Sequence, residues 1–165
     1  MSAAFSIDTD CDDISGFRSG YRVFDDYLRH RNDSAVIHYV TDSATDRLVA
    51  YFSLAAYGAM YGDPANMNIV PAIELSMFAL DERYHGTGVS GILLDDAIEI
   101  IKLYAKKHVG PEIIILYAVP AQHVIDLYKS KGFKTVGGLL TAFRSEFTEG
   151  CVPMYMTIGE PPADG

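Results

Sequence analysis

The sequence has few cysteines, no long hydrophobic run and a shortage of basic residues. Two cysteines, Cys11 and Cys151, are too few for a disulfide framework. The longest apolar runs, such as residues 113–119, fall well short of the roughly 18 residues that a membrane-spanning helix needs, so we expect no membrane partner. The first residues carry neither a basic patch nor an apolar core, which argues against a secretory signal and predicts a cytoplasmic protein.

Basic side chains are outnumbered by acidic ones. The 165 residues include 13 Lys and Arg against 22 Asp and Glu, a formal charge of −9 at pH 7. Such a charge repels phosphate backbones and favours cationic partners, so it disfavours nucleic acid, although a local basic patch can persist on an acidic protein. The other proportions are those of an ordinary globular chain, and we expect one domain over residues 1–165.

Hydrophobic spacing predicts that the first half of the chain is mainly antiparallel sheet. A short strand comes before a helix that carries Tyr21, Phe24, Tyr27 and Leu28 at helical spacing. Residues 35–40 and 48–56 are typical of a hairpin. After a turn over residues 61–68, we expect residues 69–80 to form a central strand with Pro71 near its start.

The second half alternates between strands and helices. An apolar stripe predicts a helix from about residue 89, which Gly110 and Pro111 end. The remaining expected elements are a buried strand (113–119), a helix from Pro120 to Gly132, a short apolar helix (139–147) and a last strand (152–158). This order predicts an α+β fold with a mixed sheet.

A glycine-rich turn joins the central strand to the long helix. Gly86 and Gly88 allow close approach to the backbone, and the free N–H groups of the first helical turn can bind a pyrophosphate. A tight turn without a ligand is the alternative explanation. The spacing Gly86-x-Gly88-x-x-Gly91 matches a dinucleotide-binding turn, but no acidic residue follows the next strand. A P-loop is excluded because Ile92 stands where lysine is required.

The stretch resembles the coenzyme loop of the GNAT superfamily of acetyl-CoA-dependent N-acetyltransferases. The family pattern Gln/Arg-x-x-Gly-x-Gly/Ala reads His85-Gly86-Thr87-Gly88-Val89-Ser90 here, so that His85 and Ser90 depart from it. Residues 128–133 are similar to the family's Tyr-x-x-x-Gly-Phe ending, while Ala121 replaces an Asn often found before that Tyr. The resemblance covers roughly residues 70–135. It implies a single acyl-CoA N-acyltransferase domain with a mixed, mostly antiparallel sheet of about six to seven strands flanked by helices.

The resemblance also implies functional residues. Acetyl-CoA is the expected donor, and it would be bound by Phe78, Ala79, Leu80, His85, Gly86, Thr87, Gly88, Val89, Ser90 and Gly91. Tyr128 is expected to protonate the departing thiolate, and Glu74 to act as general base through water. The alternatives are a core tyrosine and a structural carboxylate. Lys129, Lys131 and Lys134 are either contacts of the coenzyme's 3′-phosphate or solvated charges.

Neither cysteines nor histidines indicate further chemistry. Cys11 and Cys151 are isolated, which favours direct transfer over an acetyl-cysteine intermediate. No histidine shares a ligand-like spacing with a cysteine or carboxylate cluster, so we predict no metal.

The acceptor is the least determined part of the reaction. Residues 17–28 resemble the opening of the GNAT toxins that acetylate aminoacyl-tRNA, and residues 152–154 resemble their final strand. Such toxins need a basic face and generally lack the strand glutamate, so we rank tRNA second. A primary amine of a small molecule, a protein lysine or an N-terminus ranks first, since Tyr21, Phe24, Tyr51, Tyr57 and Tyr61 suit a cationic group.

Two further alternatives concern catalysis and assembly. The chain could be an acyl-CoA-binding domain without catalytic activity. The last strand and residues 139–147 are expected either to form the interface of a homodimer or to close the core of a monomer.

Overall fold

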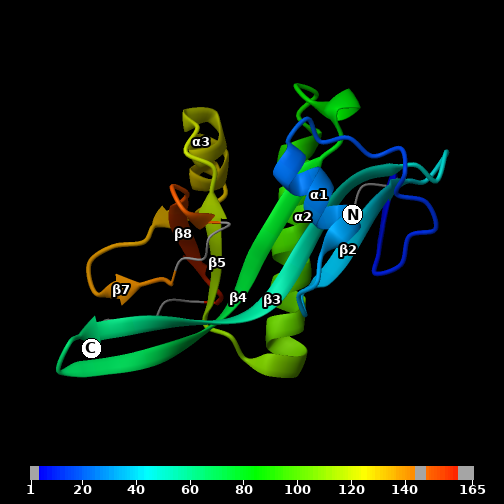
Figure 1. Ribbon diagram of the computed structural model, residues 1–165. Helices are drawn as coiled ribbons and strands as arrows, with labels where there is room; N and C mark the ends of the chain where they lie inside the picture. The colour runs from blue at the N-terminus through cyan, green and yellow to red at the C-terminus, as the bar shows by residue number, and fades with distance from the viewer. Residues whose placement is uncertain (1–3, 144–147, 160–165) are drawn as a thin grey trace. The chain divides into compact units, whose positions relative to one another are not determined.

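The computed structural model describes residues 4–143 and 148–159, and the chain divides into two compact units. The first contains Met1–Ala55 and Leu75–Ala97, and the second contains Ala56–Glu74 and Ile98–Gly165. Strands β3 (Leu48–Asp63) and β4 (Asn66–Leu80) and helix α2 (Val89–Tyr104) each contribute residues to both units, as can be followed in Figure 1. The strand order is β1-β2-β3-β4-β5-β8-β6, with β7 paired to β3. This mixed, mostly antiparallel sheet confirms the predicted α+β class, with eight strands instead of six or seven.

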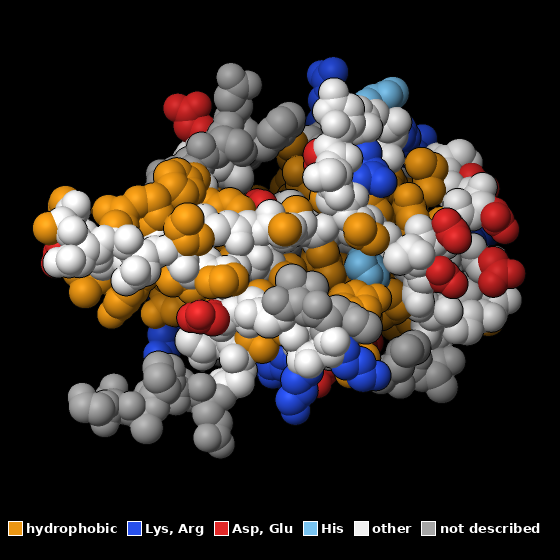
Figure 2. Space-filling view, turned by 90° about the horizontal axis from the view of Figure 1, so that it is seen from below, with side chains coloured by type: hydrophobic (Ala, Val, Ile, Leu, Met, Phe, Trp, Pro, Cys, Tyr) orange, Lys and Arg blue, Asp and Glu red, His pale blue; other side chains and the backbone are white. Residues whose placement is uncertain are grey.

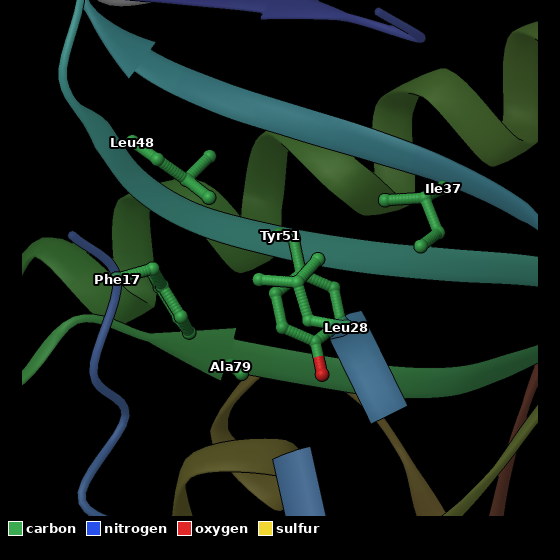
Figure 3. Packing of buried hydrophobic residues seen from close by; sticks show 6 residues of the cluster. All are labelled: Phe17, Leu28, Ile37, Leu48, Tyr51 and Ala79. Atoms are coloured by element: carbon green, nitrogen blue, oxygen red, sulfur yellow. The ribbon is translucent and has the colours of Figure 1, made fainter. Parts of the chain in front are cut away.

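The first unit has its own hydrophobic core. It holds β1 (Phe5–Asp8), α1 (Arg22–His30), β2 (Val36–Asp42) and the short 3₁₀ turn η1 (Glu82–Tyr84). Strands β1, β2 and β3 pair antiparallel in that order. The core comprises Phe17, Leu28, Ile37, Leu48, Tyr51 and Ala79 (Figure 3). Tyr51 is fully buried, and its hydroxyl donates to Phe24 O over 2.7 Å. The expectation that Tyr51 contacts the amine substrate is therefore wrong.

The second unit is built on β5 (Ile113–Ala118) and β8 (Val152–Thr157). It also contains α3 (Gln122–Ser130), β6 (Lys134–Thr135), β7 (Leu140–Thr141) and the π-helical turn η2 (Ala105–Val109). Its core includes Ala59, Ala72, Ile113, Ile115 and Leu140. Gly110 follows η2 in the left-handed region, with φ of 68°, and ends the helix where the sequence predicts.

Strands β3 and β4 form a longer hairpin than the sequence predicts. Asp63 Oδ1 accepts the N–H groups of Ala65 and Asn66 over 2.8 and 2.9 Å, which confines the turn between the strands to residues 64 and 65. Pro71 therefore lies inside β4 and not near its start. The proline is tolerated because β4 pairs with β5 only from Ala72 onward, so its missing N–H removes no bond from that ladder.

Residues 139–147 do not form the predicted helix as far as the structure describes them. Leu140 and Thr141 form β7, which pairs with Tyr61 and Met60 of β3, because extended chain can satisfy the edge of that strand. Residues 144–147 of the predicted helix lie outside the described residues.

Hydrophobic side chains gather over the β3–β4 hairpin (Figure 2). Ile69 is 76% exposed, and Tyr61 and Met67 are about half exposed. Strand β8 pairs with β5 along one edge, and along the other edge β6 pairs with its residues Met154 and Tyr155. The homodimer stays a prediction. Within the described part of the chain, no helix is long and apolar enough to cross a membrane.

The first unit also buries a histidine, which makes its stability dependent on pH. His38 is 4% exposed and stacks on Phe52 with ring centroids 4.8 Å apart. Burial lowers the pKa of His38, against a smaller opposing effect of a main-chain hydrogen bond at Val36. As the pH falls below about 6.5, the unfolded chain takes up a proton that the folded chain resists.

We therefore expect the protein to lose stability from about pH 6.5 downward, by up to about 1.4 kcal/mol per pH unit until the folded-state pKa is reached. His38→Phe keeps a ring on Phe52 and should lose less stability over the same interval. Urea denaturation of both proteins at several pH values measures the difference. Parallel curves for the two proteins would contradict the role of His38.

Candidate functional site

The candidate coenzyme strand is the part of β4 that continues beyond its pairing with β5. The parallel register runs from Ala72 opposite Ile113 to Glu74 opposite Ile115. In the described chain, the β5 register reaches no residue of β4 beyond Glu74, although β4 extends to Leu80. A strand edge without a ladder partner presents N–H and C=O groups to a ligand. Phe78 and Leu80, both half-buried, lie on this stretch.

The turn after β4 is held by local hydrogen bonds. Asp81 N–H donates to Val49 O over 2.8 Å, and Tyr84 N–H donates to Asp81 O over 2.9 Å. His85 Nε2 lies 3.1 Å from Leu80 O, and its main-chain N–H donates to Glu82 O. Through these contacts His85 caps the turn. The main chain of the glycine turn is then the candidate for contact with the phosphates.

Gly86 and Gly88 have φ angles of 72° and 80°, in the left-handed region that disfavours other residues. No atom of the chain lies within 4 Å of a Cβ built on either glycine, so it is the backbone conformation, not crowding within the chain, that requires glycine. Helix α2 begins at Val89 with no acidic residue in its first turn. The first N–H groups of a helix have no intrahelical partners, and no carboxylate of this first turn competes for them. They are therefore suited to bind a pyrophosphate.

All ten predicted coenzyme residues lie in the first unit, and the two predicted catalytic residues lie in the second. Tyr128 of α3 is 8% exposed and packs edge-to-face on Phe133, with ring centroids 5.8 Å apart. Burial raises the pKa of Tyr128 to about 12, so the phenol is protonated at neutral pH. Glu74 is half-buried and lies opposite Ile115 in the β4–β5 register.

One residue of the loop has a larger structural part than the sequence indicates. Asp81 follows β4 directly and its side chain is 1% exposed. Its carboxylate pairs with Arg83, with Nε 2.7 Å from Oδ1, and accepts Arg18 N–H over 3.1 Å. Burial on its own raises the pKa of Asp81, but the hydrogen bonds from Arg83 and Arg18 outweigh it and hold that pKa below its ordinary value. Sequence shows the Asp81-x-Arg83 spacing but not the burial.

Metal-ligating side chains do not gather in the described part of the chain. Among residues 4–143 and 148–159, no three His, Cys, Asp or Glu side chains are placed to hold a metal ion. The first unit does contain an open cleft of about 960 Å³, whose lining includes Asp8, Asp10, Asp12, Asp13 and Asp46. Its acidic lining makes it unsuited to phosphate groups.

Replacing a glycine of the turn tests whether the turn binds the coenzyme. Gly88→Ala forces a methyl group onto a left-handed residue, at a cost of about 1–2 kcal/mol of stability, and fills the open space beside it. We expect acetyl-CoA to bind roughly tenfold more weakly or worse, as titration calorimetry would show. Gly110→Ala is the matched control, because Gly110 has φ of 68° and equally open surroundings at η2. Equal coenzyme affinities of the two variants would contradict the assignment.

Comparison with known proteins identifies the family. No family model matches the chain. A tRNA-acetylating toxin of Mycobacterium tuberculosis (strain ATCC 25618 / H37Rv) is 32% identical over 124 residues, covering 67% of this chain and 72% of the toxin. Similar folds occur in AtaT complexed with acetyl-methionyl-tRNAfMet (TM-score 0.69, 18% identity, 93% and 94% of the two chains) and in AtaTR bound with acetyl-CoA (0.69, 18%, 94% of each). A third is the KacTA–DNA complex (0.69, 17%, 93% of each). The chain therefore belongs to the GNAT superfamily of acetyl-CoA-dependent N-acetyltransferases, with a tRNA-acetylating toxin among its relatives.

Proposed function

We propose that this acetyltransferase transfers the acetyl group of acetyl-CoA to the α-amino group of an aminoacyl-tRNA. The observation that carries the proposal is the 32% identity to a tRNA-acetylating toxin over 72% of that toxin's length. The toxin-like opening at residues 17–28 agrees with it. The comparisons thus favour the acceptor that the sequence ranks second over small amines and protein lysines.

The distribution of charge removes the main objection to a nucleic acid. The chain carries −9 overall, yet all six of its lysines lie between Lys102 and Lys134. That segment contains only two carboxylates, Glu112 and Asp126, so its formal charge is +4. Lys129 at the end of α3 and Lys134 in β6 are both exposed. Because phosphate contacts depend on local charge, this segment is a suitable surface for RNA despite the acidic total.

An aminoacyl acceptor also reduces the need for a strong general base. An α-amino group has a pKa of about 7.7–8.0, so about a third of it is neutral at pH 7.5, whereas only about 0.1% of a lysine amine with a pKa near 10.4 is neutral. The neutral nitrogen attacks the thioester carbonyl carbon, the C–S bond breaks, and the sulfur leaves as thiolate. The amine proton then passes to water or to Glu74. Main-chain N–H groups of residues 78–80 would stabilise the oxyanion, and Tyr128 would protonate the thiolate.

Acetyl transfer to defined acceptors tests the proposal. With labelled acetyl-CoA, we expect label in aminoacyl-tRNA, none in uncharged tRNA, which lacks the amine, and little in lysine peptides. The Lys129→Ala and Lys134→Ala variants should each raise the KM for tRNA and reduce the salt slope of binding by about one. Arg47→Ala removes an exposed charge from the first unit outside residues 17–28 and serves as the control. Faster labelling of lysine peptides than of aminoacyl-tRNA would disprove the proposal.

Substitution at the two candidate catalytic residues separates their roles. Tyr128→Phe removes the proton donor and keeps the packing on Phe133, so kcat should fall by about 10²-fold or more with little change in the KM for either substrate. Glu74→Gln should lower kcat by less than about tenfold, because about a third of the acceptor amine is already neutral at pH 7.5. Steady-state kinetics with aminoacyl-tRNA measures both effects, with Tyr104→Phe, at an exposed tyrosine of α2, as a control. Full activity of Tyr128→Phe would exclude this tyrosine as the acid.

A further inference from the structure

Asp81 is a buried charge for which the chain supplies several hydrogen-bond donors. Its side chain is 1% exposed. Oδ1 accepts Arg83 N–H over 3.0 Å and Arg83 Nε over 2.7 Å, and Oδ2 accepts Arg83 Nη2 and Arg18 N–H, each over 3.1 Å. A buried carboxylate with fewer donors would retain a large desolvation penalty. The bonds therefore hold the carboxylate in one orientation.

The donors come from two segments that are distant in the sequence. Arg83 belongs to η1, which Asp81 caps, and η1 leads directly into the glycine turn. Arg18 belongs to residues 17–20, at the start of the toxin-like segment 17–28. A second main-chain bond joins the same two segments, because Glu82 N–H donates to Arg18 O over 2.8 Å. Residues 17–20 and the start of the candidate coenzyme loop are thus joined by two hydrogen bonds of Arg18, one to the Asp81 side chain and one from the Glu82 main chain.

The close approach extends to the end of η1. Gly20 has φ of 81°, and a Cβ built there would lie 3.8 Å from the His85 ring and 3.9 Å from Glu82 Oε2. The left-handed turn at Gly20 is therefore located beside the residues that lead into Gly86.

Residues 17–20 are in turn fixed to helix α1. Arg29 Nη2 donates to Phe17 O over 2.8 Å, and Ser19 N–H donates to Asp25 Oδ1 over 2.9 Å. Phe17 is 1% exposed in the first unit's core. The segment that meets Asp81 is therefore attached to α1 and to the core of the first unit.

We propose that Asp81 is a positioning residue for coenzyme binding, joining η1 to residues 17–20 and so fixing the direction in which the Gly86–Gly91 turn presents its N–H groups. This inference rests on the proposed function only in taking that turn as the pyrophosphate site, and it is independent of the acceptor. It also gives residues 17–20 a role in holding the donor substrate.

Asp81→Asn tests the role with little change in side-chain size. Its amide oxygen can replace only one carboxylate oxygen, and its amide nitrogen would oppose the donors Arg83 Nη2 and Arg18 N–H on the other, so the ion pair and the bond to Arg18 would be lost while the cap is kept. We expect the Kd for acetyl-CoA to rise roughly tenfold, since a small displacement of binding groups has effects of this order or larger. At saturating acetyl-CoA, kcat should stay within about twofold of the parent value and the KM for tRNA should be unchanged. Calorimetry with acetyl-CoA alone gives the Kd without any acceptor.

Arg83→Gln and a double variant show whether the effect passes through the Asp81–Arg83 pair. Arg83→Gln removes the guanidinium bonds from a side chain that is 45% exposed, so it is a safe choice should Asp81→Asn not fold. It should raise the Kd by a smaller factor, and the double variant should bind no more weakly than Asp81→Asn, because both changes break one network. Asp33→Asn, which breaks the Arg31–Asp33 pair of the same unit, is the matched control and should leave the Kd unchanged.

Three results would overturn the inference: a lower melting temperature for Asp81→Asn with an unchanged Kd, an equal rise in Kd for Asp33→Asn, or an unchanged Kd for Arg83→Gln. Normal coenzyme binding by the parent protein without transfer to aminoacyl-tRNA would instead count against the proposed function alone. The role of Asp81 and the aminoacyl-tRNA acceptor are therefore tested by different results.

Discussion

Within the described residues, strand β4 leaves its pairing with β5 after Glu74 and continues for six residues to Leu80, and the candidate donor site depends on that stretch of strand edge. Main-chain groups at such an edge are bonded by solvent or by a ligand, because an unsatisfied buried N–H is costly. The segment after the edge is firmly fixed, since a capped 3₁₀ turn, a buried carboxylate and two left-handed glycines lead to the start of α2. A thioester and a pyrophosphate need donors in defined directions, and a main chain held in this way provides them.

Periodicity and turn chemistry predicted most of the fold because they act locally. Helix α2, strand β5 and the left-handed stop at Gly110 lie where apolar spacing and glycine place them. The failures arise from tertiary pairing. Leu140 and Thr141 look helical in isolation, but β3 offers them a strand edge, and the Asp63 side chain shortens a turn that composition alone makes appear long.

The candidate site also contains features that local sequence predicts and features that depend on tertiary contacts. The glycine turn could be predicted because its backbone conformation demands a residue type that is visible in the sequence. The importance of Asp81 could not, since it depends on contacts with Arg18, which lies 63 positions earlier in the chain. Tyr51 shows the opposite error. The sequence assigns this aromatic residue to the amine substrate, but it is a core residue hydrogen-bonded to the Phe24 carbonyl. Net charge gives no information on this point, because a sum over the chain discards the positions of the charges, and those positions decide where a polyanion can bind.

The confinement of lysine to residues 102–134 has a chemical consequence for an enzyme whose cosubstrate acylates amines. In the unit that contains the candidate coenzyme loop, every Lys or Arg position is an arginine, and a guanidinium stays protonated and is a poor nucleophile. That unit therefore offers the thioester no lysine amine, and adventitious self-modification cannot neutralise the Arg83 contact that supports the loop. The other unit is exposed to such modification, where each acetylated lysine would lose its positive charge.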